Sequence, residues 1–89
     1  MIKKIEVNSR CERKFEKICK QDNKLFRKIV KTLKLFKENP EYPGLKLHKI
    51  GGKKYKVWSM FVKKDFRILF EYVKNGILIT DIGSHDEVY

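Results

Sequence analysis

The sequence lacks the features of a membrane protein, of a zinc-binding protein and of a secreted protein with disulfides. No apolar run in its 89 residues is long enough to span a bilayer, and the first residues lack the apolar stretch of a signal peptide. Cys11 and Cys19 would lie about 12 Å apart on one helix, which is too far for a disulfide. No cysteine–histidine spacing resembles a zinc site. We therefore expect a cytoplasmic protein with reduced thiols and without a membrane partner, metal or cofactor.

Acidic residues are also scarce. The chain has 22 Lys and Arg against 11 Asp and Glu, a net charge of +11, and residues 1–40 hold 13 of the basic but only 5 of the acidic side chains. Such an excess favours polyanions, namely nucleic acid, an acidic protein or an anionic membrane. Because the charges are spread along predicted helices, they belong to a folded surface rather than to a tail. A merely soluble basic surface is the simpler alternative.

Length and patterning predict one α+β domain over residues 1–89. Residues 2–7 alternate weakly and predict a first strand. A helix is expected to start near Ser9, because Glu12 stands three residues later as in a capping box. A second amphipathic helix is expected over residues 24–37. The two helices would form an antiparallel hairpin with a shared apolar face.

The remainder of the chain predicts strands. An Asn-Gly pair at residues 75–76 is a strong hairpin signal between two of them. The expected strands cover residues 45–50, 55–62, 66–73 and 77–82. This order predicts a two-helix hairpin packed on a three- to four-stranded, mainly antiparallel sheet, with the other face of the sheet left open.

The candidate chemistry lies on that open face. Alternation along the strand over residues 66–73 places Arg67 opposite the apolar set that would face the helices. His48 would point outward beside Lys46, and His85 and Tyr89 follow the last strand. Two histidines and an arginine match the base, acid and cation that RNA cleavage by its own 2′-hydroxyl requires. The simpler alternative is solvated histidines and an arginine paired with a carboxylate, such as Asp65 or Asp81.

Several segments together resemble a known family. These are Leu45 to His48, Asp65-Phe66-Arg67-Ile68-Leu69-Phe70, and the closing Asp81-Ile82-Gly83-Ser84-His85-Asp86-Glu87-Val88-Tyr89. With the chain length, basic charge and element order, they resemble the RelE/ParE superfamily of toxins from bacterial type II toxin–antitoxin modules. The resemblance implies a compact α+β fold. In the RelE and YafQ branches it implies cleavage of mRNA in the ribosomal A site without a metal ion.

The resemblance also implies a catalytic set. His48 matches a histidine of the YafQ-like branch and would be the general base, and His85 matches the C-terminal catalytic histidine and would be the general acid. Arg67 matches the arginine that contacts the scissile phosphate. Asp65 matches an active-site acid, and Tyr89 falls where the family keeps a functional aromatic residue.

The sequence departs from the family in one strand. Trp58 and Met60 occupy positions where RelE uses catalytic lysines, and Phe61 replaces a second strand histidine of the YafQ branch. The mechanism would therefore be centred on histidines. Trp58 could stack on RNA bases or lie in the core. The residues expected to bind RNA are Trp58, Phe66 and five lysines that could equally be generic solvated residues, namely Lys46, Lys49, Lys53, Lys54 and Lys56.

The functional prediction is a ribosome-associated endoribonuclease toxin that inhibits translation. Its partners would be mRNA, the ribosome and a cognate antitoxin with an acidic, amphipathic segment. One alternative is a ParE-like toxin, which shares the fold but inhibits DNA gyrase and cleaves nothing. The two histidines favour the nuclease, because a pure inhibitor needs no imidazoles at those positions. A further alternative is an inactive nucleic-acid-binding relative.

Overall fold

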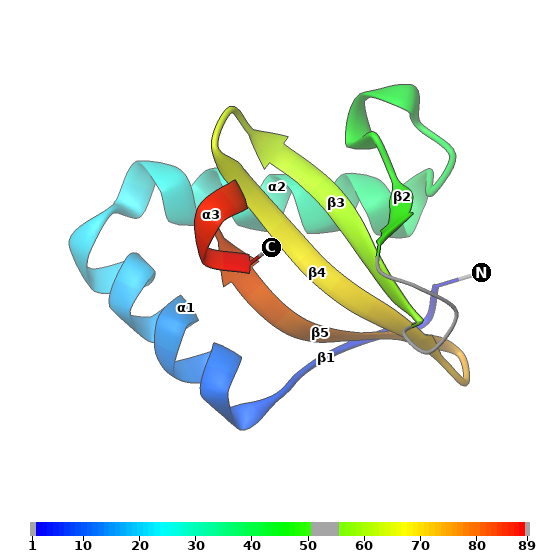
Figure 1. Ribbon diagram of the computed structural model, residues 1–89, viewed down its shortest axis with the longest axis horizontal. Coiled ribbons are helices and arrows are strands. Elements are labelled where there is room, and N and C mark those ends of the chain that lie inside the picture. Colours follow the sequence, from blue (N-terminus) through cyan, green and yellow to red (C-terminus); the bar gives the residue numbers. More distant parts are fainter. Residues whose placement is uncertain (1, 51–55, 89) are drawn as a thin grey trace.

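The computed structural model describes residues 2–50 and 56–88, apart from the side chain of His85. Five strands form one sheet in the order β1-β5-β4-β3-β2 (Figure 1). The strands are β1 (Lys4–Val7), β2 (His48–Ile50), β3 (Val57–Lys63), β4 (Phe66–Val73) and β5 (Gly76–Gly83). The helical elements are α1 (Ser9–Gln21), α2 (Asn23–Glu38), the 3₁₀ turn η1 (Pro43–Leu45) and the short α3 (His85–Val88).

The α+β architecture predicted from the sequence is confirmed, with a correction to the sheet. The sheet has five strands rather than three or four. The additional pairing comes from β1, which lies parallel to β5 and places Lys4 beside Gly76 and Val7 beside Ile79. The other neighbours in the sheet are antiparallel, as expected for strands joined by hairpins.

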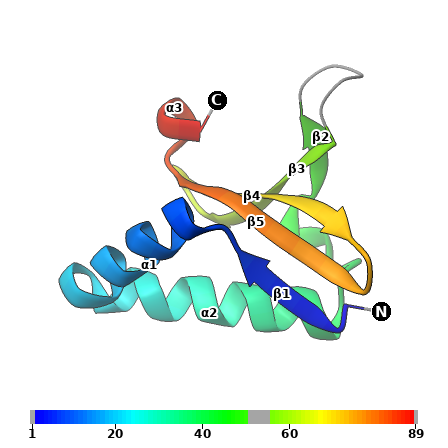
Figure 2. The ribbon, with the colours of Figure 1, turned by 90° about the horizontal axis from the view of Figure 1, so that it is seen from below.

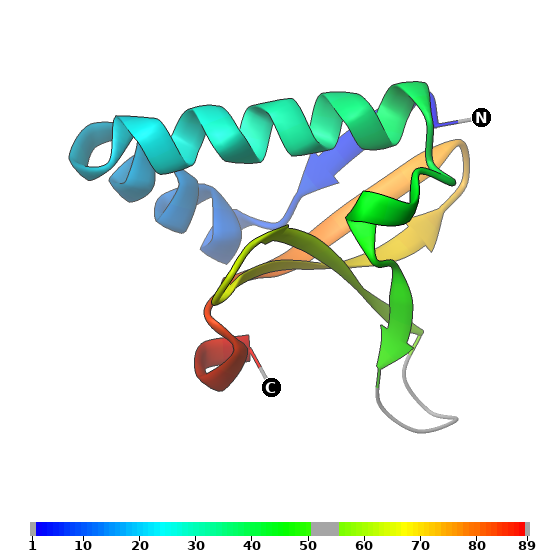
Figure 3. The same cartoon turned by 90° about the horizontal axis from the view of Figure 1, so that it is seen from above.

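The helical hairpin of α1 and α2 covers one face of the sheet, whereas α3 lies on the opposite side (Figure 3). The core fills the space between the hairpin and the sheet. Ile29 and Phe36 of α2 and the central strand residue Phe70 are completely buried. The rings of Phe36 and Phe70 lie 5.4 Å apart and are tilted by 58°. Because one face is covered in this way, alternate residues of each strand are sorted between core and open face.

The first helix starts at Ser9, which confirms the predicted start, but the expected capping box of Ser9 and Glu12 is not what caps it. Asn8, not Ser9, is its N-cap, and the Asn8 side-chain oxygen accepts a hydrogen bond of 2.8 Å from the Cys11 backbone N–H. The Asn8 amide also donates to the Thr80 carbonyl at 3.1 Å and so joins the start of α1 to β5. At the second helix, Asp22 is the N-cap, and its side chain accepts a hydrogen bond from the Leu25 N–H at 3.1 Å.

The strand predicted over residues 45–50 is shorter in the structure. Leu45 is buried, but it ends η1, and the strand starts only at His48. Lys46, between them, has φ +46° and ψ +45°, a left-handed conformation that non-glycine residues rarely adopt. Tyr55, expected in the next strand, lies outside the described residues. That strand begins at Val57.

The two cysteines differ in their surroundings. Cys11 and Cys19 form no disulfide. Cys11 is buried and Cys19 is exposed, and burial raises the pKa of the Cys11 thiol. Within residues 2–50 and 56–88, no helix is long and apolar enough to cross a membrane.

Candidate functional site

The candidate site lies on the face of the sheet that the helical hairpin leaves uncovered. In Figure 2, α3 rises from one side of this face, and β2 with the adjoining end of β3 rises from the other. The site therefore has a floor of central strands and two raised sides. α3 packs against both β4 and β5, which fixes the first of these sides.

Strand register assigns the residues on this floor. Phe61 of β3, Arg67 of β4 and Gly83 of β5 stand side by side, and each follows or precedes a residue of the core. In the next row, His48 of β2 faces Ser59 of β3. Phe66, Ile68 and Phe70 of β4 belong to the buried core, as the alternation predicted, and Arg67 is half-buried on the other face. Leu69, the next residue of the Arg67 set, is buried as well.

A cluster of two cations and one ring lies at the centre of the candidate site. The Lys46 ammonium is 4.5 Å from the centre of the Phe61 ring, and the Arg67 guanidinium carbon is 4.6 Å from it. Both distances fall within the range of cation–π attraction. Phe61 therefore brings two positive groups from distant parts of the chain to one place. The left-handed backbone at Lys46 is part of this arrangement.

The Arg67 guanidinium is held from the protein side by carbonyl groups. Its Nη1 donates to the carbonyl oxygens of Lys63 at 3.0 Å and Phe66 at 3.3 Å. The first of these bonds spans an irregularity in register where β3 ends. In the part of the chain that the structure describes, no carboxylate lies within ion-pair distance of Arg67 or Lys46. Both charges are therefore available to an anion.

His48 starts β2 and is exposed. Its Nδ1 lies 3.2 Å from the carbonyl oxygen of Lys46, the residue that contacts the Phe61 ring. A carbonyl only accepts hydrogen bonds, so this contact favours the imidazole tautomer that carries its proton on Nδ1. In that tautomer Nε2 has a free lone pair, as a general base requires. This contact holds the His48 ring, the candidate base, next to the backbone of Lys46 in the two-cation cluster.

The side of the site formed by α3 begins with a capping box that sequence reasoning missed. The Glu87 carboxylate accepts from the Ser84 N–H at 3.0 Å, and the Ser84 hydroxyl accepts from the Glu87 N–H at 3.2 Å. His85 is the first residue of the helix that this box starts. Gly83 has φ +150°, and a Cβ there would lie 3.2 Å from the Glu87 Cβ. Only glycine suits this position.

Acidification is expected to open this capping box. The hydrogen bond from the Ser84 N–H, followed by the Ser84 hydroxyl, lowers the pKa of Glu87 below its usual value. A carboxylate with a lowered folded-state pKa stabilises the folded state above its unfolded pKa, and the effect is lost as pH falls through the folded value. We expect the Ser84 amide resonance to shift in the acid range in wild-type protein. Glu87→Gln should abolish that titration; an unchanged titration in the variant would contradict the assignment.

Asp81 is engaged elsewhere and is not the partner of Arg67. Its carboxylate pairs with Lys14 and lies 4.0 Å from Arg10, both on α1. It also accepts from the Ile82 N–H at 2.9 Å. Asp81 therefore fastens α1 to the end of β5. Asp65 is exposed in the turn between β3 and β4, with φ +65°, and is not seen paired with Arg67 either.

Several residues expected to bind RNA lie away from this face. Phe66 is only 8% exposed and packs in the core, so the prediction that it contacts RNA is withdrawn. Trp58 also faces the helices, beside Phe70 in register and 5.6 Å from the Tyr72 ring, which supports the core alternative. Lys49 is opposite Trp58 in register and shares its side. Lys56 is exposed just before β3.

Three of the expected residues and one side chain lie outside the described part of the chain. Lys53, Lys54 and Tyr89 are not described, and for His85 only the backbone is described. Of the expected catalytic set, the structure brings Arg67 and His48 to one face and places His85 at the start of α3 on the same side of the sheet (Figure 2).

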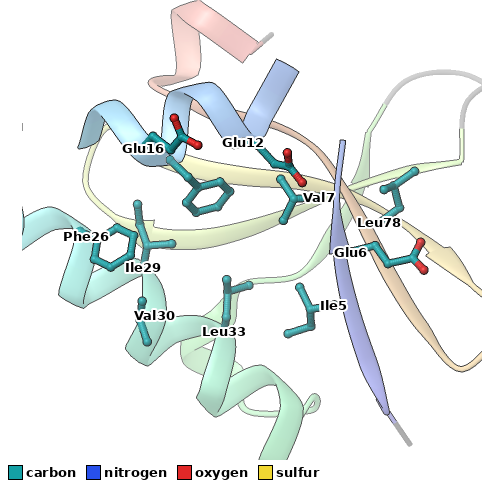
Figure 4. Close-up of a pocket in the computed structure, with 11 residues that line it drawn as sticks. Ile5, Glu6, Val7, Glu12, Glu16, Phe26, Ile29, Val30, Leu33 and Leu78 are labelled. Atoms are coloured by element: carbon teal, nitrogen blue, oxygen red, sulfur yellow. The ribbon is translucent and has the colours of Figure 1, made fainter. Parts of the chain in front are cut away.

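A groove of opposite character lies on the other side of the molecule. It has a volume of about 720 Å³ between β1, α1 and α2, and it is lined mostly by apolar side chains, including the 49% exposed Val30 (Figure 4). The charged residues that line it are all glutamates: Glu6, Glu12 and Glu16. An apolar floor with acidic sides repels phosphate. A nucleic-acid surface is therefore expected elsewhere.

Comparison with solved structures finds close matches in fold. A chain of the YoeB–YefM complex from Staphylococcus aureus has a TM-score of 0.77 and 18% identity, covering 92% of this chain and 95% of that one. The E. coli DinJ–YafQ toxin–antitoxin complex gives 0.77 and 16%, covering 100% and 99%. The YoeB/ParE toxin from Agrobacterium tumefaciens gives 0.77 and 15%, covering 93% and 99%.

These proteins are similar to this chain in structure rather than in sequence. No protein-family model matches the sequence, and no curated protein matches it. At 15–18% identity, what this chain shares with each of these proteins is the fold, and the similarity extends over almost the full length of the two compared chains. The protein therefore has the fold of the YoeB and YafQ toxins, as the sequence resemblance implied.

Proposed function

We propose that this protein is the toxin of a type II toxin–antitoxin module and that it is an endoribonuclease of the RelE/YafQ type, acting on mRNA at the ribosome. The observation that carries the proposal is the pair of cations on Phe61. Arg67 and Lys46 lie there without a carboxylate partner among the described residues, and His48 is bonded to the Lys46 carbonyl. Such a site is suited to a phosphodiester.

The proposed reaction needs no metal ion. His48 Nε2 removes the proton of the RNA 2′-hydroxyl, whose oxygen attacks the adjacent phosphorus. The bond from phosphorus to the 5′-oxygen breaks, and His85 gives that oxygen a proton. The products are a 2′,3′-cyclic phosphate and a free 5′-hydroxyl. Arg67 and Lys46 stabilise the extra negative charge on the crowded phosphate, where fixed donors have the greatest effect.

A cognate antitoxin is part of the proposal. Two of the similar structures are complexes, YoeB–YefM and DinJ–YafQ. For this chain, the net charge of +11 favours an antitoxin with an acidic, amphipathic segment. The runner-up function is inhibition of DNA gyrase without cleavage, and the match to a YoeB/ParE toxin is the observation in its favour.

Primer extension on mRNA in a translating extract tests the proposal. Wild-type protein should produce discrete cleavage sites, and His85→Ala should lower the cleavage rate at least 10²-fold, as expected for loss of a general acid. Asp86→Ala is the matched control, because Asp86 is the next residue of α3 and is exposed; it should cleave as the wild type does.

Two other results would change the conclusion. Cleavage by His85→Ala at the wild-type rate would remove His85 from the mechanism. An absence of cleavage by wild-type protein, together with inhibition of DNA supercoiling by purified gyrase, would replace the nuclease with the ParE-like function.

A further inference from the structure

A basic cleft adjoins the two-cation cluster at the edge of the sheet. It has a volume of about 470 Å³ and lies between α2, the η1 segment and the end of β3. The charged residues that line it are four lysines, Lys28 and Lys31 from α2 and Lys63 and Lys64 at the turn after β3. No Asp or Glu of the described chain lines it. The cleft is thus the electrostatic opposite of the groove with the three glutamates.

The charges of these lysines are not neutralised by the described part of the protein. Its ion pairs join Lys4 to Glu6, and Arg10 and Lys14 to Asp81, none of which touches the cleft. Four ammonium groups around one concave space repel each other and concentrate positive potential there. An anionic ligand would relieve that repulsion.

The cleft continues directly from the candidate site. Phe61 lines the cleft, and its ring also contacts Lys46 and Arg67. Lys63 contributes to the cleft, and its carbonyl accepts a hydrogen bond from the Arg67 guanidinium. Phe61 therefore borders both the cluster of two cations and the cleft of four lysines. A ligand with successive phosphates could occupy both.

An aromatic ring in the cleft indicates nucleic acid rather than an acidic protein. Tyr42 lines it and is 45% exposed, so its ring is accessible to a ligand in the cleft. Its ring rests on the backbone of Gly44, where a Cβ would lie 2.3 Å from the Tyr42 Cε2. The absence of a side chain at Gly44 therefore leaves room for the ring in this position. Lysines that hold phosphates and a ring on which a base stacks are the usual means of binding single-stranded RNA.

We propose that this cleft, lined by Lys28, Lys31, Lys63, Lys64 and Tyr42, binds the single-stranded RNA that flanks the scissile phosphate. The proposal rests on the proposed nuclease function for the direction of the strand across Phe61, but binding itself does not require cleavage. The lysines hold backbone phosphates and Tyr42 stacks on a base. Because neither contact reads a base edge, the cleft adds affinity without adding sequence preference.

The test measures binding of a fluorescent 12-nucleotide RNA with 2′-O-methyl groups, which cannot be cleaved through its 2′-oxygens. Fluorescence anisotropy gives the affinity between 50 and 200 mM salt. Each phosphate contact to single-stranded RNA contributes about 0.7 to the slope of log affinity against log salt. The double variant Lys31→Ala, Lys64→Ala should therefore reduce that slope by about 1.4, with a loss of affinity of roughly 10-fold or more at the lower salt.

The matched control is Lys20→Ala, Lys74→Ala, which removes the same charge from exposed positions outside the cleft. It should change the slope by less than about 0.3. Equal losses in the two double variants would overturn the proposal, because net charge alone would then explain binding. Circular dichroism should be the same for all variants, since each changed side chain is exposed.

Gly44→Ala tests the aromatic contact separately. The added methyl group would displace the Tyr42 ring while leaving every charge in place, so RNA affinity should fall several-fold with an unchanged salt slope. A 12-residue polyglutamate peptide is the alternative probe. If it binds as tightly as the RNA, with the same dependence on the two lysines and none on Gly44, the cleft is a protein-docking site and the RNA proposal is wrong. RNA binding as predicted by a protein that fails to cleave mRNA would overturn the nuclease function alone.

Discussion

Arg67→Ala is expected to lower kcat/KM for RNA cleavage by about 10²–10³-fold, the usual effect of removing a fixed donor from a developing negative charge. Its guanidinium lies over Phe61, is oriented by the carbonyls of Lys63 and Phe66, and meets no carboxylate of the described chain. The loss should appear mainly in kcat, because the charge that Arg67 meets is greatest in the transition state. Single-turnover cleavage of a defined mRNA measures it.

Arg67→Lys distinguishes a positioned guanidinium from a positive charge. A lysine keeps the charge but loses the planar set of donors that can serve two backbone carbonyls and a phosphate together. We expect a loss nearly as large as in Arg67→Ala. Arg13→Ala, at an exposed position of α1, is the control and should retain wild-type activity. Wild-type cleavage by Arg67→Lys would reduce the role of Arg67 to general electrostatics.

Phe70→Ala should lower the free energy of unfolding by about 4 kcal/mol, the typical result of removing a buried phenylalanine. Phe70 is completely buried in β4, and its ring lies 5.4 Å from those of both Phe36 and Tyr72. A domain of this length has a stability of roughly 4–13 kcal/mol, so the variant is expected to be largely unfolded or close to it at 37 °C. Urea denaturation followed by circular dichroism measures the change.

Tyr72→Ala provides the comparison on the same strand. Tyr72 is 48% exposed, and its loss removes aromatic contacts with Trp58 and Phe70 without opening a closed cavity. We expect a cost of about 1 kcal/mol, in keeping with the strength of single aromatic pairs. Equal destabilisation by the two variants would mean that the centre of the core lies elsewhere.

The two faces of β4 could be predicted from sequence because local alternation determines them. Phe66, Ile68 and Phe70 form an apolar set that Arg67 interrupts, and the structure places them accordingly. β3 carries no such signal, since both of its alternating sets are largely apolar. Pairing with β4 settles its orientation, because Met60 lies opposite buried Ile68 and thus Phe61 must face the other way. The place of Phe61 in the candidate site therefore depends on strand pairing, which the local sequence of β3 does not reveal.

The capping signal shows both the value and the limit of local rules. Ser-x-x-Glu occurs twice, at Ser9 with Glu12 and at Ser84 with Glu87. At the first place the cap is Asn8, because its side chain also reaches the Thr80 carbonyl in a strand more than seventy residues away. At the second place the pattern forms a complete box, and it could have been found from the sequence.

The contact of Lys46 with Phe61 could not be predicted in this way. It depends on a left-handed backbone at Lys46, which the sequence does not favour, and on the strand register that brings Phe61 beside Arg67. The cleft of four lysines has the same origin. Its residues come from α2 and from the turn after β3, and only the packed fold brings them together.

The parallel pairing of β1 with β5 has a consequence for how the protein is made. Residues 4–7 find their strand partners only in residues 76–79, which are made much later. Contacts so distant in sequence form late, because a long loop must close before they are gained. The same late strand leads into α3 and His85. We therefore expect a nascent chain to stay without a complete sheet, and without an assembled candidate site, until residues 76–79 have been made and can pair with β1.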